Sequence, residues 1–251
     1  MEAIGWSYHG RRRATAPLTF PAVSAPIDWK PADRRRTRAI QGRLRVAYGR
    51  PVPYAHRAPI DELILTVLSQ NTNDRNRDVA YGRLRERFET WAQVRDAPET
   101  EIEEAIRPGG ISKVKAARIK SILEVVGHDD LAWLETAPLE DARAYLCALP
   151  GVGRKTAACV LLFSYLRPDV PVDTHVFRVG TRLGLFRPGA GLEEAHDELL
   201  RLTAPEDAYE AHVSLIRHGR RTCTARNPAC AGCPLLELCP HGRSIIAADR
   251  A

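Results

Sequence analysis

The sequence predicts an all-α protein. Apolar residues recur at helical spacing from about residue 32 onward, and the strict alternation typical of a β-strand is nearly absent. Leu, Ala, Arg and Glu, which favour helices, are abundant, whereas aromatic residues make up 6% of the 251 residues. An apolar content of 44% is enough for a hydrophobic core and argues against a chain that is disordered throughout.

The expected elements follow one another along the chain. Residues 1–30 show no apolar period and contain three prolines, so they predict a flexible basic arm. Prolines and glycines then separate a series of helical patterns, because these residues interrupt or end helices. The expected helices cover about residues 32–48, 61–68, 76–88, 99–107, 113–126, 138–147, 154–167, 174–183, 192–202 and 206–219.

Positive charge is concentrated near the N-terminus. The net charge is +6, but residues 1–50 alone carry +8, which leaves −2 for the remaining 201 residues. Seven arginines lie on or beside the first expected helix, and three more lie in the arm. Basic segments of this kind commonly contact nucleic acid phosphates, although charge alone also fits a solvated helix face.

The sequence shows no sign of a membrane span or of secretion. No apolar run reaches transmembrane length, and the N-terminus lacks the apolar stretch of a secretion signal. We therefore expect a cytoplasmic protein that is not associated with a membrane. A mitochondrial presequence over residues 1–25 is the alternative.

Four of the six cysteines lie within seventeen residues near the C-terminus, with the spacing C-x6-C-x2-C-x5-C. Clustered thiols in a chain without a secretion signal indicate metal ligands more often than disulfides. Four thiolates suit a [4Fe–4S] cluster or tetrahedral zinc, but zinc sites usually show two short C-x2-4-C pairs and only the middle pair has that form here. The spacing favours iron–sulfur over zinc and over uncommitted thiols. The ligands would be Cys223, Cys230, Cys233 and Cys239.

A second motif, residues 149–157 (LPGVGRKTA), joins two expected helices. Pro150 ends the first helix, and Gly151 and Gly153 permit a tight turn. The free amides at the start of the second helix would then face outward in a positive dipole field, which suits a phosphate.

These residues carry a resemblance. The hairpin motif, the sequence Val172-Asp173-Thr174-His175 and the four-cysteine loop, in this order, resemble the endonuclease III branch of the helix–hairpin–helix DNA glycosylases. The resemblance covers about residues 32–240. It implies two helical lobes with a DNA cleft between them, and duplex DNA containing a damaged base or an abasic site as the partner. The lobes would be a six-helix barrel at 52–167, with the hairpin at about 140–165, and an iron–sulfur cluster lobe at 31–51 and 168–251.

The resemblance assigns the chemistry to Lys155 and Asp173. Lys155 matches the catalytic lysine, whose amine would attack C1′ of a damaged nucleotide, displace the base and leave a Schiff base before β-elimination cuts the strand. Partial burial and the helix N-terminus should lower its pKa. Asp173 matches the catalytic aspartate, and its position before a helical pattern also fits an N-cap.

Further site residues follow from the same resemblance. Two loops would fill the gap left by a flipped base, one through Asn71, where the family usually has glutamine, and one through Ile111. Asp74 and His175 would line the base pocket. The expected DNA contacts are Gly151, Val152, Gly153, Arg154, Thr156, Asn71, Ile111 and Arg226.

The expected activity is a base-excision DNA glycosylase with AP lyase activity toward damaged, oxidised pyrimidines. One alternative is a monofunctional mismatch or damaged-base glycosylase. The adenine-mismatch branch typically lacks the hairpin lysine and uses a glutamate where this chain has Thr66. The other is a non-catalytic iron–sulfur protein that binds DNA or senses redox state, which would not need both Lys155 and Asp173.

Overall fold

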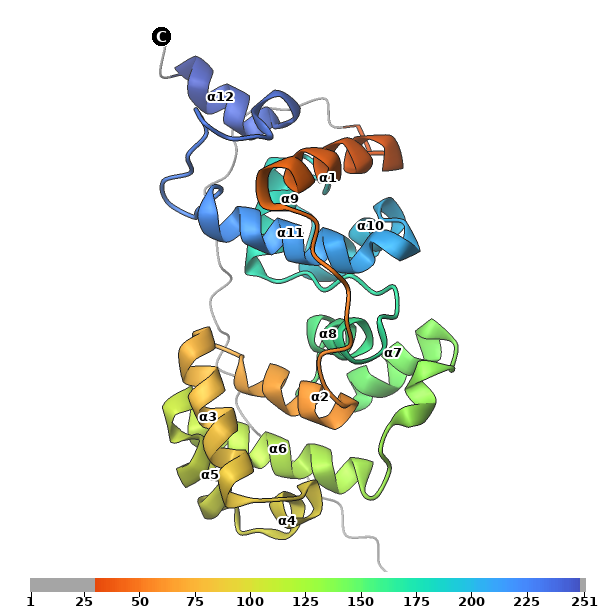
Figure 1. Cartoon of the computed structure of the whole chain (residues 1–251), viewed down its shortest axis with the longest axis vertical. Helices are drawn as coiled ribbons and strands as arrows, with labels where there is room; N and C mark the ends of the chain where they lie inside the picture. The colour runs from red at the N-terminus through yellow and green to blue at the C-terminus, as the bar shows by residue number, and fades with distance from the viewer. Residues whose placement is uncertain (1–29, 249–251) are drawn as a thin grey trace, which may run out of the picture.

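The computed structural model describes residues 30–248, and every regular element within that range is a helix (Figure 1). The prediction of an all-α protein is confirmed. None of the described helices is both long enough and apolar enough to span a membrane. The predicted basic arm (apart from Lys30) and the alternative presequence lie outside the described residues.

The middle of the chain forms the lower lobe of Figure 1, which we call the barrel lobe. Its buried core draws on all of its longer helices, and α2 packs against α3, α6 and α8. The lobe consists of α2 (Pro59–Leu68), α3 (Asp74–Arg87), α4 (Trp91–Asp96), α5 (Glu99–Ile106), η1 (Arg107–Gly109), α6 (Ser112–Val126), η2 (Ala132–Glu135), α7 (Leu139–Ala148) and α8 (Arg154–Tyr165).

Both ends of the described chain meet in the upper lobe, which we call the cluster lobe (Figure 1). The N-terminal helix α1 packs on α11, and α11 packs on α9, so that residues far apart in sequence share a second core. The elements are α1 (Arg34–Tyr48), α9 (Thr174–Arg182), α10 (Leu192–Leu202), η3 (Pro205–Asp207), α11 (Ala208–Arg221), η4 (Leu236–Leu238) and α12 (Pro240–Ala248).

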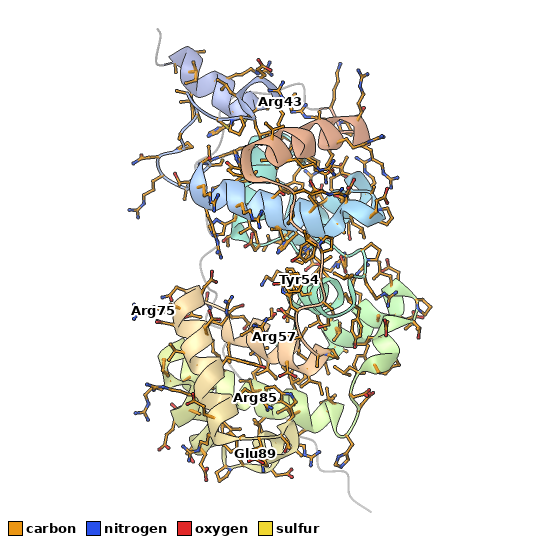
Figure 2. The ribbon with its side chains drawn as sticks, in the orientation of Figure 1. Arg43, Tyr54, Arg57, Arg75, Arg85 and Glu89 are labelled. Atoms are coloured by element: carbon orange, nitrogen blue, oxygen red, sulfur yellow. The ribbon has the colours of Figure 1, made fainter. Side chains whose placement is uncertain are left out.

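Helix α8 belongs to both cores. Leu161 is buried in the barrel core and the next residue, Leu162, in the core of the cluster lobe. The segment before α2 also ties the lobes together, because the His56 ring stacks on Phe163 of α8 at 4.6 Å and its Nε2 lies 2.9 Å from the Tyr209 hydroxyl of α11. Figure 2 shows the neighbouring Tyr54 between the two lobes.

A buried ion network fixes the two helices of the hairpin to the segment that follows them. The Asp169 carboxylate is fully buried and accepts hydrogen bonds from Arg143 Nε at 2.9 Å and from Arg154 Nη1 at 2.5 Å. Arg154 was expected to contact DNA, but its side chain lies in this network and is 8% exposed. Its backbone amide lies in the first turn of α8, which has no side-chain cap.

The arginines of α1 are used mainly inside the cluster lobe. Arg36 donates to the carbonyl oxygens of Leu183 and Leu238 at 2.6 and 3.0 Å. Arg45 forms a bidentate pair with the buried Glu210 carboxylate, at 2.5 and 2.8 Å. These side chains therefore hold α1 on the helices beneath it, a role that charge alone did not reveal.

Replacement of Asp169 by asparagine should destabilise the fold strongly, because two buried guanidinium groups lose their one buried counter-charge and keep only the exposed carboxylates of Glu140 and Asp197. Loss of one partner of a buried pair costs about 3–5 kcal/mol. At about 2–4 °C per kcal/mol, thermal denaturation should show a Tm lower by on the order of 10 °C. The control is Asp197→Asn, since Asp197 also faces Arg154 (3.7 Å) but is exposed. Equal Tm values for Asp169→Asn and Asp197→Asn would contradict the importance of this network.

Candidate active site

The hairpin between α7 and α8 has the predicted shape. Helix α7 gives way to extended backbone at Leu149, and Gly151 adopts φ +69°, in the left-handed region that favours glycine. A Cβ at residue 151 would also collide with the Arg118 side chain. Gly153 is the N-cap of α8 and offers no side-chain cap, so the first amides of α8 stay available to an anion. Gly151 and Gly153 are exposed, whereas Val152 and Thr156 are buried.

Lys155 lies in the first turn of α8 and is partly buried. Its amine hydrogen-bonds with the Cys159 thiol, one turn further along the helix. The carboxylates of Asp173 and Glu62 act on its charge from two other elements. The hairpin lysine therefore lies among a thiol and two acidic side chains.

The pKa of Lys155 is raised, and not lowered as the sequence predicted. Interaction with Cys159 is the largest influence and raises this pKa; burial, next in size, lowers it, and Asp173 and Glu62 raise it further. Burial raises the pKa of Cys159 itself to about 11. At neutral pH the free protein therefore holds Lys155 as an ammonium ion, and the amine must lose a proton before it can act as a nucleophile.

Asp173 is the N-cap of α9, as its position in the sequence indicated. Its Oδ1 accepts a hydrogen bond from the Val176 amide at 2.7 Å. The cap fixes the side chain close enough to Lys155 for the two charges to interact. The Asp173 carboxylate can therefore cap a helix and interact with the charge of Lys155 at the same time.

Two neighbours of this pair were not predicted as site residues. Glu62 on α2 is 5% exposed, and burial raises its pKa. Thr66 Oγ1 donates to its Oε1 at 3.4 Å, and the Arg57 guanidinium (labelled in Figure 2) lies 3.8 Å from its Oε2. In the sequence, the only signal for Glu62 was a glutamate within an otherwise apolar helix, and the same pattern fits a glutamate that is exposed to solvent.

The second neighbour of Lys155 and Asp173 that was not predicted is His212 on α11, which is 3% exposed. Burial lowers its pKa to about 4, so the ring is neutral at physiological pH. Its Nδ1 lies 2.8 Å from the Pro171 carbonyl oxygen and must donate, which leaves Nε2 as the acceptor. Asp173 and Lys155 both act on its charge. Nothing in the spacing of His212 distinguished it from a packed histidine.

The two predicted wedge residues lie at the tips of loops of the barrel lobe. Asn71 follows α2, is exposed and has φ +53°, whereas Ile111 precedes α6, is 53% exposed and has φ +41°. Left-handed backbone is costly for a β-branched residue such as isoleucine. The Ile111 side chain is exposed to solvent and does not pack in the barrel core, in spite of this costly backbone conformation.

The two residues expected in the base pocket have other contacts here. Asp74 begins α3 and is paired with Arg220 of the cluster lobe, at 2.8 Å, and with Arg77, at 3.1 Å. This exposed pair joins the two lobes. His175 lies against α11, where a Cβ on Gly219 would come within 3.0 Å of its Cβ, and its Nδ1 lies 3.1 Å from Arg178 Nη2.

The four cysteines of the C-terminal loop line one cavity between α9, α11 and α12. Within residues 30–248, no three His, Cys, Asp or Glu side chains come close enough to hold a single metal ion. Four cysteines around a shared cavity supply the four thiolates that a [4Fe–4S] cluster needs. The cluster would be held by Cys223, Cys230, Cys233 and Cys239.

N–H groups surround these sulfurs. Arg182 Nη1 donates to Cys223 Sγ at 3.2 Å, and the amides of Leu235 and Gly242 donate to the sulfurs of Cys233 and Cys239. Such donors stabilise thiolate ligands and tune a cluster. Arg226 is exposed on the loop, at a place where a phosphate could reach it.

Comparisons with known proteins agree with this arrangement. Residues 64–205 match the HhH-GPD superfamily base excision DNA repair protein family, and residues 223–239 match the iron-sulfur binding domain of endonuclease III. The chain is 33% identical over 182 residues to endonuclease III of Sulfolobus acidocaldarius, which covers 71% of this chain and 80% of that protein.

Solved structures extend the likeness to the fold. A non-covalent endonuclease III–DNA complex and a trapped covalent endonuclease III–DNA intermediate each match with a TM-score of 0.74 at 30% identity. Each match covers 86% of this chain and 99% of the other.

Glu62→Gln should stabilise the protein at neutral pH. Burial raises the folded-state pKa of Glu62, so the stability from its protonated form is complete below the unfolded pKa of about 4.3 and is lost as pH rises through the folded value. The neutral glutamine side chain does not ionise, so the variant does not lose this stability as pH rises. The Tm of the variant should exceed that of the wild type at about pH 8, and the difference should shrink toward about pH 5. Glu86→Gln, at an exposed position, should show no such trend; a Glu62→Gln protein less stable than wild type at pH 8 would refute this account.

Cys233→Ser should give a colourless protein that folds poorly, because closure of the loop depends on the cluster. Cys147→Ser, which changes a cysteine outside the cavity, should keep the iron content and visible absorbance of the wild type. Iron analysis and absorption spectra measure both. A stable Cys233→Ser protein with full iron content would show that this cysteine is not a ligand.

Proposed function

This chain belongs to the HhH-GPD superfamily of base excision DNA repair proteins, and on that basis we propose that Lys155 and Asp173 are its catalytic pair. The chain is a base-excision DNA glycosylase with AP lyase activity, and it holds a [4Fe–4S] cluster. The observation that carries the assignment is the position of Lys155, directly after the hairpin and within electrostatic reach of Asp173.

Duplex DNA would bind along the side of the molecule where the hairpin, the two loop tips and the cysteine loop are exposed. The hairpin glycines let a phosphate approach the free amides at the start of α8, and no side chain competes for them. Asn71 and Ile111 would fill the space of a flipped nucleotide, which lowers the cost of a few kcal/mol for taking a base out of the stack.

The glycosylase step needs Lys155 as a neutral amine. Asp173 takes its proton, and the amine forms a bond to C1′ while the bond from C1′ to the base breaks with its electron pair on the base. The departing base takes this proton from Asp173, and the carboxylate that is restored stabilises positive charge that develops on the sugar.

The lyase step follows from the same bond. A second proton passes from the nitrogen to the ring oxygen O4′ as the bond from C1′ to O4′ breaks, which opens the sugar ring and gives a Schiff base between Lys155 and C1′. This imine makes the C2′ proton acidic. Its removal breaks the bond from C3′ to the 3′ phosphate oxygen, which cuts the strand, and water then releases the lysine.

Bound between the four cysteines, the [4Fe–4S] cluster closes the C-terminal loop on the cluster lobe. All four of its ligands would be protein thiolates, which suits a structural role. Arg182 holds this loop from α9 by donating to the carbonyl oxygens of Thr224 and Ala225 at 2.7 and 2.9 Å. The exposed Arg226 would then contact the DNA backbone.

We propose damaged, oxidised pyrimidines as the substrate class. We also propose that the protein works as a monomer in the cytoplasm, at the bacterial nucleoid, because its substrate is duplex DNA and its thiols must stay reduced. A monofunctional glycosylase is not favoured, because Lys155 is present and Thr66 stands where the adenine-mismatch branch has its glutamate. A non-catalytic iron–sulfur protein would not need the pair of Lys155 and Asp173.

Product analysis with two variants tests the assignment. On a duplex with one dihydrouracil, wild type should release the base and cut the strand. Lys155→Ala should abolish strand cutting yet still bind the lesion, because only the nucleophile is lost. Asp173→Asn should keep the helix cap through its amide oxygen and lower the single-turnover rate by roughly 10²–10⁴-fold. Strand cutting by Lys155→Ala at the wild-type rate would contradict the proposal. Undamaged duplex and a G:T mismatch are the substrate controls.

A further inference from the structure

Lys115, in the second turn of α6, is the largest fully buried side chain in the described part of the protein. Within residues 30–248 it forms no ion pair. Its Nζ donates instead to two backbone carbonyl oxygens, those of Leu68 at 2.7 Å and Gly109 at 2.8 Å. A buried ammonium ion without a carboxylate partner is costly. The proposed chemistry makes no use of Lys115, so the geometry must be explained in another way.

Each of the two carbonyl groups lies just before the tip of one of the two wedge loops, whose tips are Asn71 and Ile111. Leu68 is the last residue of α2, three positions before Asn71, and helix ends leave such carbonyl oxygens without a partner. Gly109 ends η1, two positions before Ile111. The Lys115 amide also donates to the Ile111 carbonyl oxygen, at 3.1 Å. One residue therefore bonds to both loops.

Both loops need such a restraint. Asn71 and Ile111 are non-glycine residues with positive φ, and their side chains are exposed, so their own packing does not hold the strained backbone. Strain of this kind persists only where the surrounding structure over-determines it. The two hydrogen bonds from Lys115 fix the distance between Leu68 and Gly109, where the two loops begin.

The same helix extends this connection to the hairpin. Arg118, one turn after Lys115, donates through Nη1 to the Gln70 side-chain oxygen. Its side chain also fills the space beside Gly151, where any other residue would place a Cβ. Helix α6 thus contacts both wedge loops and the phosphate-binding turn.

We propose that Lys115 is a positioning residue that holds the two wedge loops at a fixed separation, so that both tips enter the duplex together. This inference rests on the proposed function, in which Asn71 and Ile111 fill the flipped-out gap. It predicts that loss of the two bonds impairs base flipping while leaving the lysine chemistry intact.

Helix α6 offers a matched control. Lys120 also donates to two backbone carbonyl oxygens, those of Arg95 at 2.7 Å and Ala97 at 2.8 Å, but these belong to the C-terminal end of α4 and its cap, and not to the wedge loops. Lys120→Met therefore removes a bond pair of the same kind from the same helix. A general effect on stability should appear in both variants, and an effect on flipping only in Lys115→Met.

The test compares both variants with wild type in single-turnover excision of dihydrouracil from a duplex that carries 2-aminopurine beside the orphaned base. Misplacement of reacting groups by about 1 Å can cost 10²-fold in rate, so Lys115→Met should slow excision roughly 10- to 100-fold. It should also remove the rise in 2-aminopurine fluorescence that reports unstacking. Cleavage of an abasic site in a single strand should stay at the wild-type rate, because no base needs to be flipped there. Lys120→Met should match wild type in all three assays.

Wild-type excision and unstacking by Lys115→Met would overturn the inference, as would an equal loss of excision in Lys120→Met. Failure of the proposed function looks different, because wild type itself would then not cleave the abasic strand. Circular dichroism and visible absorbance check that each variant folds with its cluster. Lys115→Gln retains a shorter N–H donor; if the methionine variant does not fold, this one carries the same comparison and should also lose excision and unstacking.

Discussion

In the proposed function the N-terminal amides of α8 stay free for a phosphate, so this helix has to be held by its sides and not by a side-chain cap. The structure meets that constraint in three ways. Residues on opposite faces of α8 enter the cores of both lobes, the Arg154 guanidinium is anchored to the buried Asp169, and His56 stacks on Phe163 between the lobes. The fixed position of α8 then determines where Lys155 meets Asp173.

The position of Lys155 beside Asp173 bears on how the proposed nucleophile would serve both the glycosylase step and the lyase step. In the free protein its surroundings favour the ammonium ion, because a thiol and two carboxylates lie around it. A charged amine does not attack, so the substrate and Asp173 together must release the nucleophile. Asp173 suits this task because the N-cap bond to Val176 fixes its side chain. The neutral His212 and the Glu62 side chain, both buried, complete the surroundings of this pair.

The sequence predicted the parts that depend on local chemistry. Apolar period and punctuation by glycine and proline located ten of the helices, the cysteine spacing indicated the iron–sulfur cluster, and the hairpin glycines indicated the tight turn before α8. It did not predict α4 and α12, which are short and have little apolar pattern. Nor did it reveal the roles of Lys115, Arg154 and Glu210, because each depends on a partner remote in sequence. Charged side chains that looked like DNA contacts or solvated faces were instead buried in ion pairs and carbonyl contacts.

The claim that most depends on measurement is the identity of the nucleophile. Wild-type protein should be incubated with duplex DNA containing dihydrouracil, reduced with borohydride, and digested so that mass spectrometry can identify the peptide that carries the DNA remnant. The account predicts one modified residue, Lys155, in the peptide that follows the hairpin. A remnant on another lysine, such as Lys113 or Lys120, or no covalent adduct with a substrate that is nevertheless cleaved, would contradict it.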